Sequence, residues 1–270
     1  MSYHQSDVPD ELEMYSVINH VSNSMKSSKK TKSAKQPTSQ SKTAATSAKS
    51  LNLTPNYLSA LTANQQVMMD AFRSGKQVAA IGSAGSGKTA VATSLAMEML
   101  FNQDVERIIF VRSAVPTRDM GFMPGTLAEK TEVFNIPYKQ IINELCGNGT
   151  AWDILTKNKR EFVQFITTSY VRGITLNNAV VIIDEAQSMN FHELDSVITR
   201  CGNNTRLIVC ADFKQNDLFN SKKEQSGLGD FVRVAEEMGD FFHIVRFGHN
   251  DIVRGEFMKN WIITKEKLGL

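Results

Sequence analysis

Residues 82–89 are the segment of this sequence with the clearest chemical role. They read Gly-Ser-Ala-Gly-Ser-Gly-Lys-Thr and match the pattern G-x-x-x-x-G-K-[ST]. In such a loop, consecutive backbone N–H groups surround phosphate oxygens, and the positive end of the following helix faces them. The lysine then reaches the β and γ phosphates, and the threonine hydroxyl holds Mg²⁺. We therefore expect a nucleoside triphosphate and its Mg²⁺ to bind here, in contact with Gly82, Ser83, Ala84, Gly85, Ser86, Gly87, Lys88, Thr89 and Ala90.

Two acidic residues follow a later apolar segment. Residues 180–183, Val-Val-Ile-Ile, are expected to form a buried strand, and Asp184 and Glu185 come directly after it. Asp184 is the expected partner of Thr89 in holding Mg²⁺, through water, and Glu185 is placed to polarise the water that attacks the γ-phosphate. A carboxylate that activates water makes water the phosphoryl acceptor, so the pattern favours hydrolysis.

A third polar segment follows the next expected strand, residues 206–210. It reads Asp-Phe-Lys-Gln at 212–215 and ends in Gln215. A residue at the tip of the strand beside Asp184 can contact the γ-phosphate and report whether it is present. Taken alone, Gln215 is an ordinary loop residue, so this sensor role depends on where its strand lies.

Short apolar segments alternate with helical ones throughout residues 51–270. The expected strands are 77–81, 107–111, 180–183, 206–210 and 243–247, and the expected helices are 61–72, 89–100, 132–145, 191–201 and 255–267. Apolar strands separated by helices are typical of a parallel sheet that is covered on both faces. The expected fold is therefore α/β, a single domain with a mainly parallel sheet between helices.

The first 50 residues differ from the rest in composition. Residues 22–50 contain seven lysines, no acidic residue and no aromatic residue. Such a segment cannot bury enough apolar area to offset chain entropy, so we expect a disordered, Lys/Ser-rich basic linker. Residues 8–21 place four apolar side chains near helical spacing, so residues 1–21 are either a short docking helix or an unstructured terminus.

The composition and the N-terminus also bear on the compartment. Three cysteines among 270 residues are too few for a disulfide framework and are typical of buried thiols in a reducing compartment. The polar, acidic start of the chain does not read as a signal peptide, and no apolar run approaches the roughly 18 residues of a membrane span. We expect a cytoplasmic protein with no membrane partner.

The chain resembles the PhoH family of ATPases, relatives of the superfamily 1 helicases, over about residues 60–260. The matching runs are Asn64-Gln65, Gly82 to Thr89, Arg112 to Pro116, Gly121 to Gly125, Tyr170 to Gly173, Asp184 to Gln187, Ile198 to Gly202, Asp212 to Leu218, Ser226 to Leu228 and Asp251 to Arg254. Its small size and lysine-rich tail suggest a phage-encoded member, for which the compartment would be the host cytoplasm.

The resemblance implies a RecA-like core that hydrolyses ATP with Mg²⁺, often as a ring, and that acts on RNA or single-stranded DNA, in some members as a helicase. Gln65 matches the glutamine that reads adenine, and Gln215 matches the γ-phosphate sensor. Arg200 and Arg254 match arginines expected near the γ-phosphate. The family has a second arginine where Ile174 stands, and this difference weakens the expectation of a nucleic-acid contact at that loop.

Chain length suggests how the ATP site is completed. A superfamily 1 helicase takes arginines from a second RecA-like domain, and 270 residues have room for one such domain. Because an arginine at the γ-phosphate is worth roughly 10³ to 10⁵ in rate, we expect a neighbouring subunit to supply it in a homo-oligomeric, hexameric ring. Arg254 is the first choice and Arg200 the second. The alternative is that Arg254 pairs with Asp251 at the start of the last helix.

Other P-loop functions are compatible with part of the pattern. A phosphotransferase acting on a small molecule or a protein remains an alternative, although it would not need Glu185 beside Asp184. A GTPase is suggested by residues 158–161, Asn-Lys-Arg-Glu, but this run ends in Glu and precedes Asp184, which is the wrong order for that class. The runner-up function is therefore the phosphotransferase.

Overall fold

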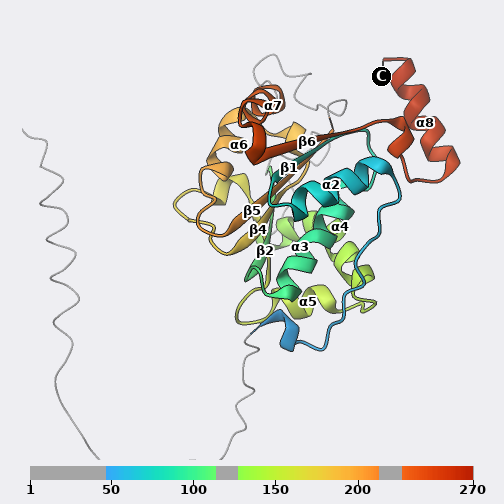
Figure 1. The fold of residues 1–270 in the computed structure, drawn as a ribbon. Coiled ribbons are helices and arrows are strands. Elements are labelled where there is room, and N and C mark those ends of the chain that lie inside the picture. The colour runs from blue at the N-terminus through green and yellow to red at the C-terminus, as the bar shows by residue number, and fades with distance from the viewer. Residues whose placement is uncertain (1–46, 114–126, 213–226, 270) are drawn as a thin grey trace, which may run out of the picture. The chain divides into compact units, whose positions relative to one another are not determined.

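The computed structural model describes residues 47–113, 127–212 and 227–269, whose fold is drawn in Figure 1. Its centre is a six-stranded sheet in the order β3-β2-β4-β5-β1-β6, in which each neighbouring pair is parallel. The strands are β1 Gln77–Gly82, β2 Arg107–Arg112, β3 Val163–Thr167, β4 Ala179–Ile183, β5 Thr205–Ala211 and β6 Phe242–Phe247. Strands of a parallel sheet are buried on both faces, which is why the apolar runs of this sequence are continuous rather than alternating.

Helices cover both faces of the sheet. They are α2 Ala63–Arg73, α3 Lys88–Asn102, α4 Leu127–Leu145, α5 Ala151–Thr156, α6 Phe191–Ile198 and α7 Leu228–Glu237. The last helix, α8 Glu256–Lys267, has no buried residue and belongs to neither core. In β4, Val180 and Ile182 pack into one core with α2, α3, α4 and α5, whereas Val181 and Ile183 pack into a second core with α6 and α7. The expected α/β fold with a RecA-like core is confirmed. No helix of the described residues is long and apolar enough to cross a membrane.

The structure contains β3, α5 and α7, which the sequence patterns did not predict. β3 is an edge strand whose middle residues are only half-buried, so its apolar signal is weak. α5 has six residues, too few to show a helical period. In α7, by contrast, Leu228, Phe231 and Ala235 are buried at helical spacing, a pattern that could have predicted the helix.

The described chain begins before the boundary expected at residue 51. A 3-10 turn, η1, spans Ala48–Ser50, and Ala48 is buried in the first core. The last residues of the expected linker therefore belong to the folded body. The remainder of that linker and the expected docking helix, residues 1–46, lie outside the described residues.

The strand order places three chemically important turns side by side. β5 lies between β1 and β4, so the loop after β1, the acids after β4 and Asp212 after β5 all follow the carboxyl ends of neighbouring strands. The register pairs Ile81 with Ala211 and Ile183 with Val209, which aligns these ends along one edge of the sheet. Residues about 100 positions apart in the chain are thereby brought into one site, as an open α/β sheet is expected to do.

Candidate nucleotide-binding site

The loop that follows β1 has a backbone that glycine permits. Gly82 lies at φ +143°, and a Cβ added to it would lie 1.9 Å from the carbonyl oxygen of Phe247 in β6, so no side chain can be accommodated there. Gly87, immediately before α3, lies at φ +77°, in the left-handed region. The phosphate-binding loop therefore leads from the end of β1 directly to the N-terminus of α3, as predicted.

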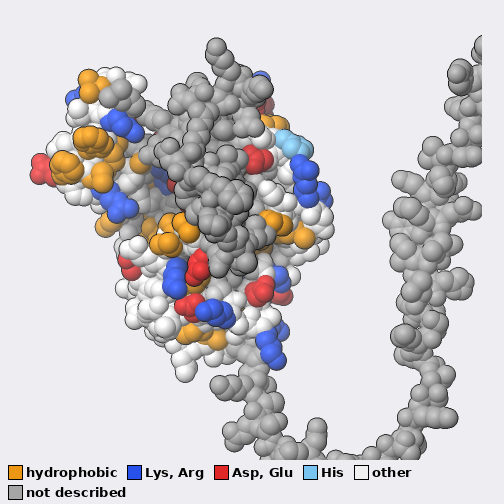
Figure 2. Space-filling view, turned by 180° about the vertical axis from the view of Figure 1, so that it is seen from behind, with side chains coloured by type: hydrophobic (Ala, Val, Ile, Leu, Met, Phe, Trp, Pro, Cys, Tyr) orange, Lys and Arg blue, Asp and Glu red, His pale blue; other side chains and the backbone are white. Residues whose placement is uncertain are grey.

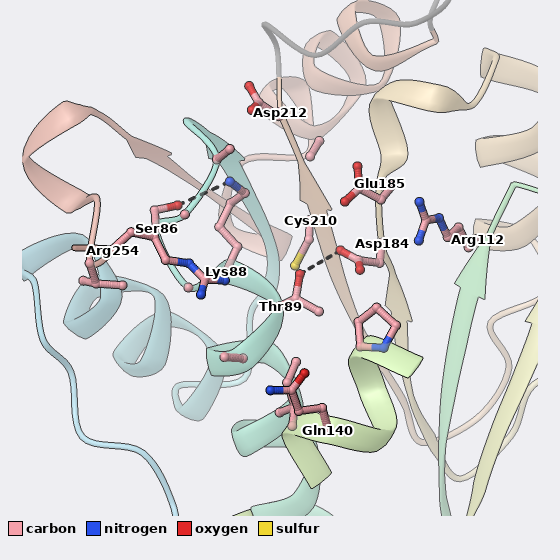
Figure 3. Close-up of a pocket in the computed structure, with 18 of the residues that line it drawn as sticks. Ser86, Lys88, Thr89, Arg112, Gln140, Asp184, Glu185, Cys210, Asp212 and Arg254 are labelled. Atoms are coloured by element: carbon pink, nitrogen blue, oxygen red, sulfur yellow. Dashed lines mark hydrogen bonds between the residues drawn. The ribbon is translucent and has the colours of Figure 1, made fainter. Parts of the chain in front are cut away.

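Lys88 occupies the centre of this loop (Figure 3). Its Nζ donates to the carbonyl oxygens of Gly82 at 2.7 Å and Ser83 at 2.9 Å, and to the hydroxyl of Ser86 at 3.3 Å. Burial lowers the pKa of Lys88, although the nearby carboxylate of Asp212 acts in the opposite direction. A partly desolvated ammonium of this kind gains strongly from an anionic partner, so the lysine is suited to bind phosphate.

The two predicted metal ligands are in direct contact. The Thr89 hydroxyl donates to Oδ1 of Asp184 at 2.9 Å (Figure 3), and Asp184 is only 6% exposed. A hydroxyl and one carboxylate are hard oxygen donors, and Mg²⁺ commonly takes one or two such groups together with substrate phosphates and water. The described residues hold no group of three or more His, Cys, Asp or Glu side chains that could bind a metal ion without a substrate. The pair therefore suits a metal that arrives with a nucleotide.

Glu185 is held in a strained, half-buried position. Its backbone lies at φ +53° and ψ +40°, a left-handed conformation that is uncommon outside glycine and is often found at functional sites. Burial, and secondly the charge of Asp184, raises the pKa of Glu185. Nε2 of Gln187, in the 3-10 turn η3 Ala186–Ser188, donates to its Oε2 at 2.6 Å. The carboxylate is thus fixed beside the metal ligands.

Arg112 is a residue of this site to which sequence reasoning gave no role. It ends β2 and points toward Asp184 and Glu185 in Figure 3, and its positive charge lowers the pKa of Glu185 against the effect of burial. Its guanidinium carbon lies 5.5 Å from the ring centroid of Phe134 in α4, a cation–π distance. A basic residue at the carboxyl end of an apolar strand was a readable signal, since the same argument located Asp184.

Arg254 lies against the phosphate-binding loop of its own chain. The backbone N–H of the preceding residue, Val253, donates to the carbonyl of Gly85 at 3.0 Å, and a Cβ added to Gly85 would lie 2.8 Å from Cγ of Arg254. The Asp251 carboxylate, instead of pairing with Arg254, accepts from Asn64 Nδ2 and the Gly248 N–H, each at 2.8 Å. This geometry favours action within one subunit rather than the expected donation to a neighbour.

Gln65 is held within the protein at both ends of its amide. Its Nε2 donates to the carbonyl of Ser86 at 2.9 Å, its Oε1 accepts from the Leu61 N–H at 2.7 Å, and the side chain is 3% exposed. It thus supports the phosphate-binding loop, and its role in reading adenine stays a prediction. Arg200 is exposed and does not line the cavity, and Gln215 lies outside the described residues.

Lys88, Thr89, Asp184 and Glu185 line one cavity of about 530 Å³. Its wall combines the phosphate-binding loop with groups from five other segments: Arg112, Pro137, Gln140, Asp184, Glu185, Gln187, Asp212 and Arg254. The structure therefore brings together Lys88, Thr89, Asp184 and Glu185 as predicted, and adds Arg112 and Gln187. A basic loop that faces an acidic pair across a cavity of this size is suited to a nucleotide with its metal.

A parallel α/β sheet with a phosphate-binding loop after β1 and an acidic pair after β4 defines a P-loop NTPase. The chain belongs to the PhoH family, since the family described as PhoH-like protein matches residues 57–265. Protein PhoH of Escherichia coli K12 is 35% identical over 187 residues, which are 69% of this chain and 52% of that protein. The PhoH-like protein of Bacillus subtilis is 32% identical over 210 residues, 76% of this chain and 63% of that protein. The chain spans about half the length of the first of these relatives.

Two solved structures match this chain with low similarity. The Pif1 helicase of Candida albicans matches 78% of this chain and 44% of its own, with 15% identity and a TM-score of 0.39. The large terminase of a thermophilic bacteriophage, in complex with ADP, matches 74% of this chain and 48% of its own, with 13% identity and a TM-score of 0.43.

Proposed function

We propose that this protein hydrolyses ATP with Mg²⁺. The observation that carries the proposal is the hydrogen bond between Thr89 and Asp184, with Glu185 half-buried beside it and Lys88 across the same cavity. When bound, Mg²⁺ neutralises charge on the β and γ phosphate oxygens. Lys88 exchanges its bonds to loop carbonyls for bonds to phosphate, and Glu185 orients and polarises the attacking water.

The surroundings of Glu185 favour water over another acceptor. Gln187 fixes one carboxylate oxygen, and Arg112 balances the negative charge of the acidic pair. A carboxylate held in this way binds and polarises a water molecule, whereas a phosphotransferase must exclude water from the γ-phosphate. We therefore rank the phosphotransferase second.

The decisive experiment measures phosphate release from ATP with Mg²⁺ in the absence of any added acceptor, with GTP in a parallel series. Steady release that requires Mg²⁺ and is lost in Lys88→Ala supports the proposal. Release only after a peptide or small-molecule acceptor is added would establish the phosphotransferase instead. Equal rates with ATP and GTP would leave hydrolysis standing and remove the assignment of adenine as the base.

We also propose that the ATPase works as a homo-oligomer, with a hexameric ring as the expected form. Three large apolar side chains of α8 and the residue after it face solvent: Phe257 is 80% exposed, Trp261 62% and Leu268 68%. Figure 2 shows hydrophobic side chains gathered on the side of the molecule where α8 lies. Exposed apolar faces of this kind mark protein contacts, and Arg200, exposed on another segment, remains the candidate for donation across an interface.

An RNA or single-stranded DNA partner is proposed on a separate observation. The 3-10 turn η2, Thr168–Tyr170, follows β3, and Tyr170 is 53% exposed. Two residues further on, Nη2 of Arg172 lies 3.2 Å from Nε2 of His192. An exposed aromatic ring two residues from an exposed arginine suits stacking on bases and contact with phosphates. ATPase rates with and without RNA, single-stranded DNA and duplex DNA test this partner, and strand separation tests helicase activity. If none of the three nucleic acids changes the ATPase rate, the proposal of a nucleic-acid partner is refuted.

A further inference from the structure

Both carboxylate oxygens of Asp184 accept a hydrogen bond from a hydroxyl group. Oδ1 accepts from Thr89, and Oδ2 accepts from the phenol of Tyr138 in α4 at 2.9 Å. Asp184 and Tyr138 are both buried, with Tyr138 completely inaccessible to solvent. The second bond belongs to no part of the nucleotide-binding motif, and it joins the acid after β4 to a helix 46 positions earlier in the chain.

The phenol oxygen of Tyr138 has little freedom to move. Its ring stacks on Phe110 of β2 with centroids 4.3 Å apart and planes 22° apart, and the ring of Phe165 in β3 lies 5.9 Å away. Ile142, one helical turn further along α4, is also fully buried in the same core. Because close-packed aromatic contacts fix a ring to within small displacements, the hydroxyl is a fixed point relative to the sheet.

We propose that Tyr138 is a positioning residue for the metal ligand Asp184, an inference that rests on the proposed Mg-ATP function. By donating to Oδ2, the phenol fixes the rotation of the carboxylate and occupies one of its two oxygens. Oδ1 is thereby directed toward the Thr89 hydroxyl, so that the two groups that would hold the metal face each other. Second-sphere hydrogen bonds of this type typically change metal affinity or activity about 10- to 100-fold.

The bond also makes the metal ligand depend on the position of α4. The same helix contributes Phe134, which lies under the Arg112 guanidinium, and Pro137 and Gln140, which line the cavity. One helix thus contacts the metal ligand, the arginine and the wall of the nucleotide cavity. A purely packing role for Tyr138 would explain its ring but not a hydroxyl directed at the carboxylate.

The test compares Tyr138→Phe, which keeps the ring and removes the hydroxyl, with two controls. Tyr57→Phe removes a phenol from a half-buried ring packed on the same core. Ile142→Val weakens the packing of α4 and keeps the Tyr138 hydroxyl. Each full-length variant is titrated with Mn²⁺ in the presence of ATP and followed by electron paramagnetic resonance, its metal-free affinity for a fluorescent ATP analogue is measured, and its thermal unfolding is recorded.

We expect Tyr138→Phe to weaken Mn²⁺ binding about tenfold or more and to leave metal-free nucleotide affinity unchanged, with both controls close to the wild type in Mn²⁺ binding. Wild-type Mn²⁺ affinity in Tyr138→Phe would overturn the proposal, and so would an equal loss in Ile142→Val. If the wild type binds Mn²⁺ with ATP but releases no phosphate, the hydrolase proposal fails, and the Mn²⁺ affinities still decide the role of Tyr138.

Discussion

Gln187 connects the carboxylate of Glu185, after β4, to the end of the neighbouring strand β5. Its Nε2 donates to Oε2 of Glu185 at 2.6 Å, and its Oε1 accepts from the backbone N–H of Asp212, directly after β5, at 2.9 Å. The amide is 2% exposed, so both bonds are shielded from water. The Gln187 side chain therefore fixes the position of the Glu185 carboxylate relative to Asp212, which begins the segment leading to Gln215.

We expect Gln187→Ala to lower kcat for ATP about 10- to 100-fold, because a hydrogen bond to a charged group contributes roughly 1.5–3 kcal/mol. ATP affinity should change little, since the hydrogen bonds of the Gln187 amide go to Glu185 and Asp212 and not to the phosphate-binding loop. Steady-state kinetics and binding of a fluorescent ATP analogue separate the two effects. Gln66→Ala, on the exposed side of α2, is the matched control and should behave as the wild type. A variant with normal kcat would remove Gln187 from the mechanism.

Lys88 and Glu185 should separate binding from chemistry. Lys88→Ala is expected to weaken ATP binding more than about 100-fold, since several charge-assisted hydrogen bonds to phosphate are lost. Glu185→Gln should bind ATP normally and lose turnover about 10²- to 10⁴-fold, the range of general-base catalysis. Fluorescence titration and phosphate release measure the two quantities. Equal turnover in Glu185→Gln and the wild type would contradict the role given to Glu185.

The position of Arg254 predicts the outcome of a subunit-mixing experiment. Arg254→Ala should lower turnover by roughly 10³-fold or more, the effect expected of an arginine at the γ-phosphate. Because Arg254 and Lys88 line the cavity of one chain, mixing Arg254→Ala with Lys88→Ala subunits should restore no activity. Recovery in the mixture would show that Arg254 acts across an interface after all.

The segment that carries Arg254 depends on a carboxylate that titrates. Burial alone raises the pKa of Asp251, but the hydrogen bonds from Asn64 and from the Gly248 N–H outweigh it, and the net pKa is lowered. A lowered pKa means that the folded state binds this proton less tightly than the unfolded chain does, so the carboxylate stabilises the fold above the unfolded pKa of about 3.9. That contribution is lost as the pH falls through the lower pKa of the folded state.

We therefore expect Asp251→Asn to reduce the free energy of unfolding by about 2 kcal/mol at neutral pH, the scale of hydrogen bonds to a charged group. Its difference from the wild type should stay constant down to about pH 5 and shrink below about pH 4. Urea unfolding across this range measures both quantities. A difference that grows with acidity would contradict the lowered pKa, and Asp240→Asn, at a fully exposed carboxylate, is the control.

How much of the site could be predicted from the sequence depended on how far apart along the chain its interacting residues lie. The loop that ends in Lys88 and Thr89 could be predicted because its chemistry lies in eight consecutive residues, and Asp184 because a strand end is visible in the sequence. Tyr138 could not, because its role depends on stacking against β2 and on contact with a residue 46 positions away. From the sequence, Gln187 is recognised only as the last residue of the matching run Asp184 to Gln187, because nothing local shows that its amide also accepts a hydrogen bond from the Asp212 N–H.

The fold followed the same rule. Central strands such as β4 are apolar throughout and could be predicted from the sequence, whereas the edge strand β3 is half-exposed and could not. Trp261 sits on the last helix, which was expected over residues 255–267 and spans Glu256–Lys267, yet its side chain is 62% exposed rather than packed inside. Apolar character alone does not distinguish a residue of the core from one exposed on the surface.

The last helix also links solvent to the phosphate-binding loop. On one side of α8, Glu266 accepts from the Ser83 hydroxyl and contacts His249, and on the other Phe257 and Trp261 face outward. If nucleotide and a molecule bound to the outer side both favour one arrangement of the loop, that molecule must raise the affinity for nucleotide. Thermodynamic reciprocity then requires nucleotide to alter the affinity for that molecule by the same factor. Binding at the outer face of α8 and binding of nucleotide would therefore each change the affinity of the other site.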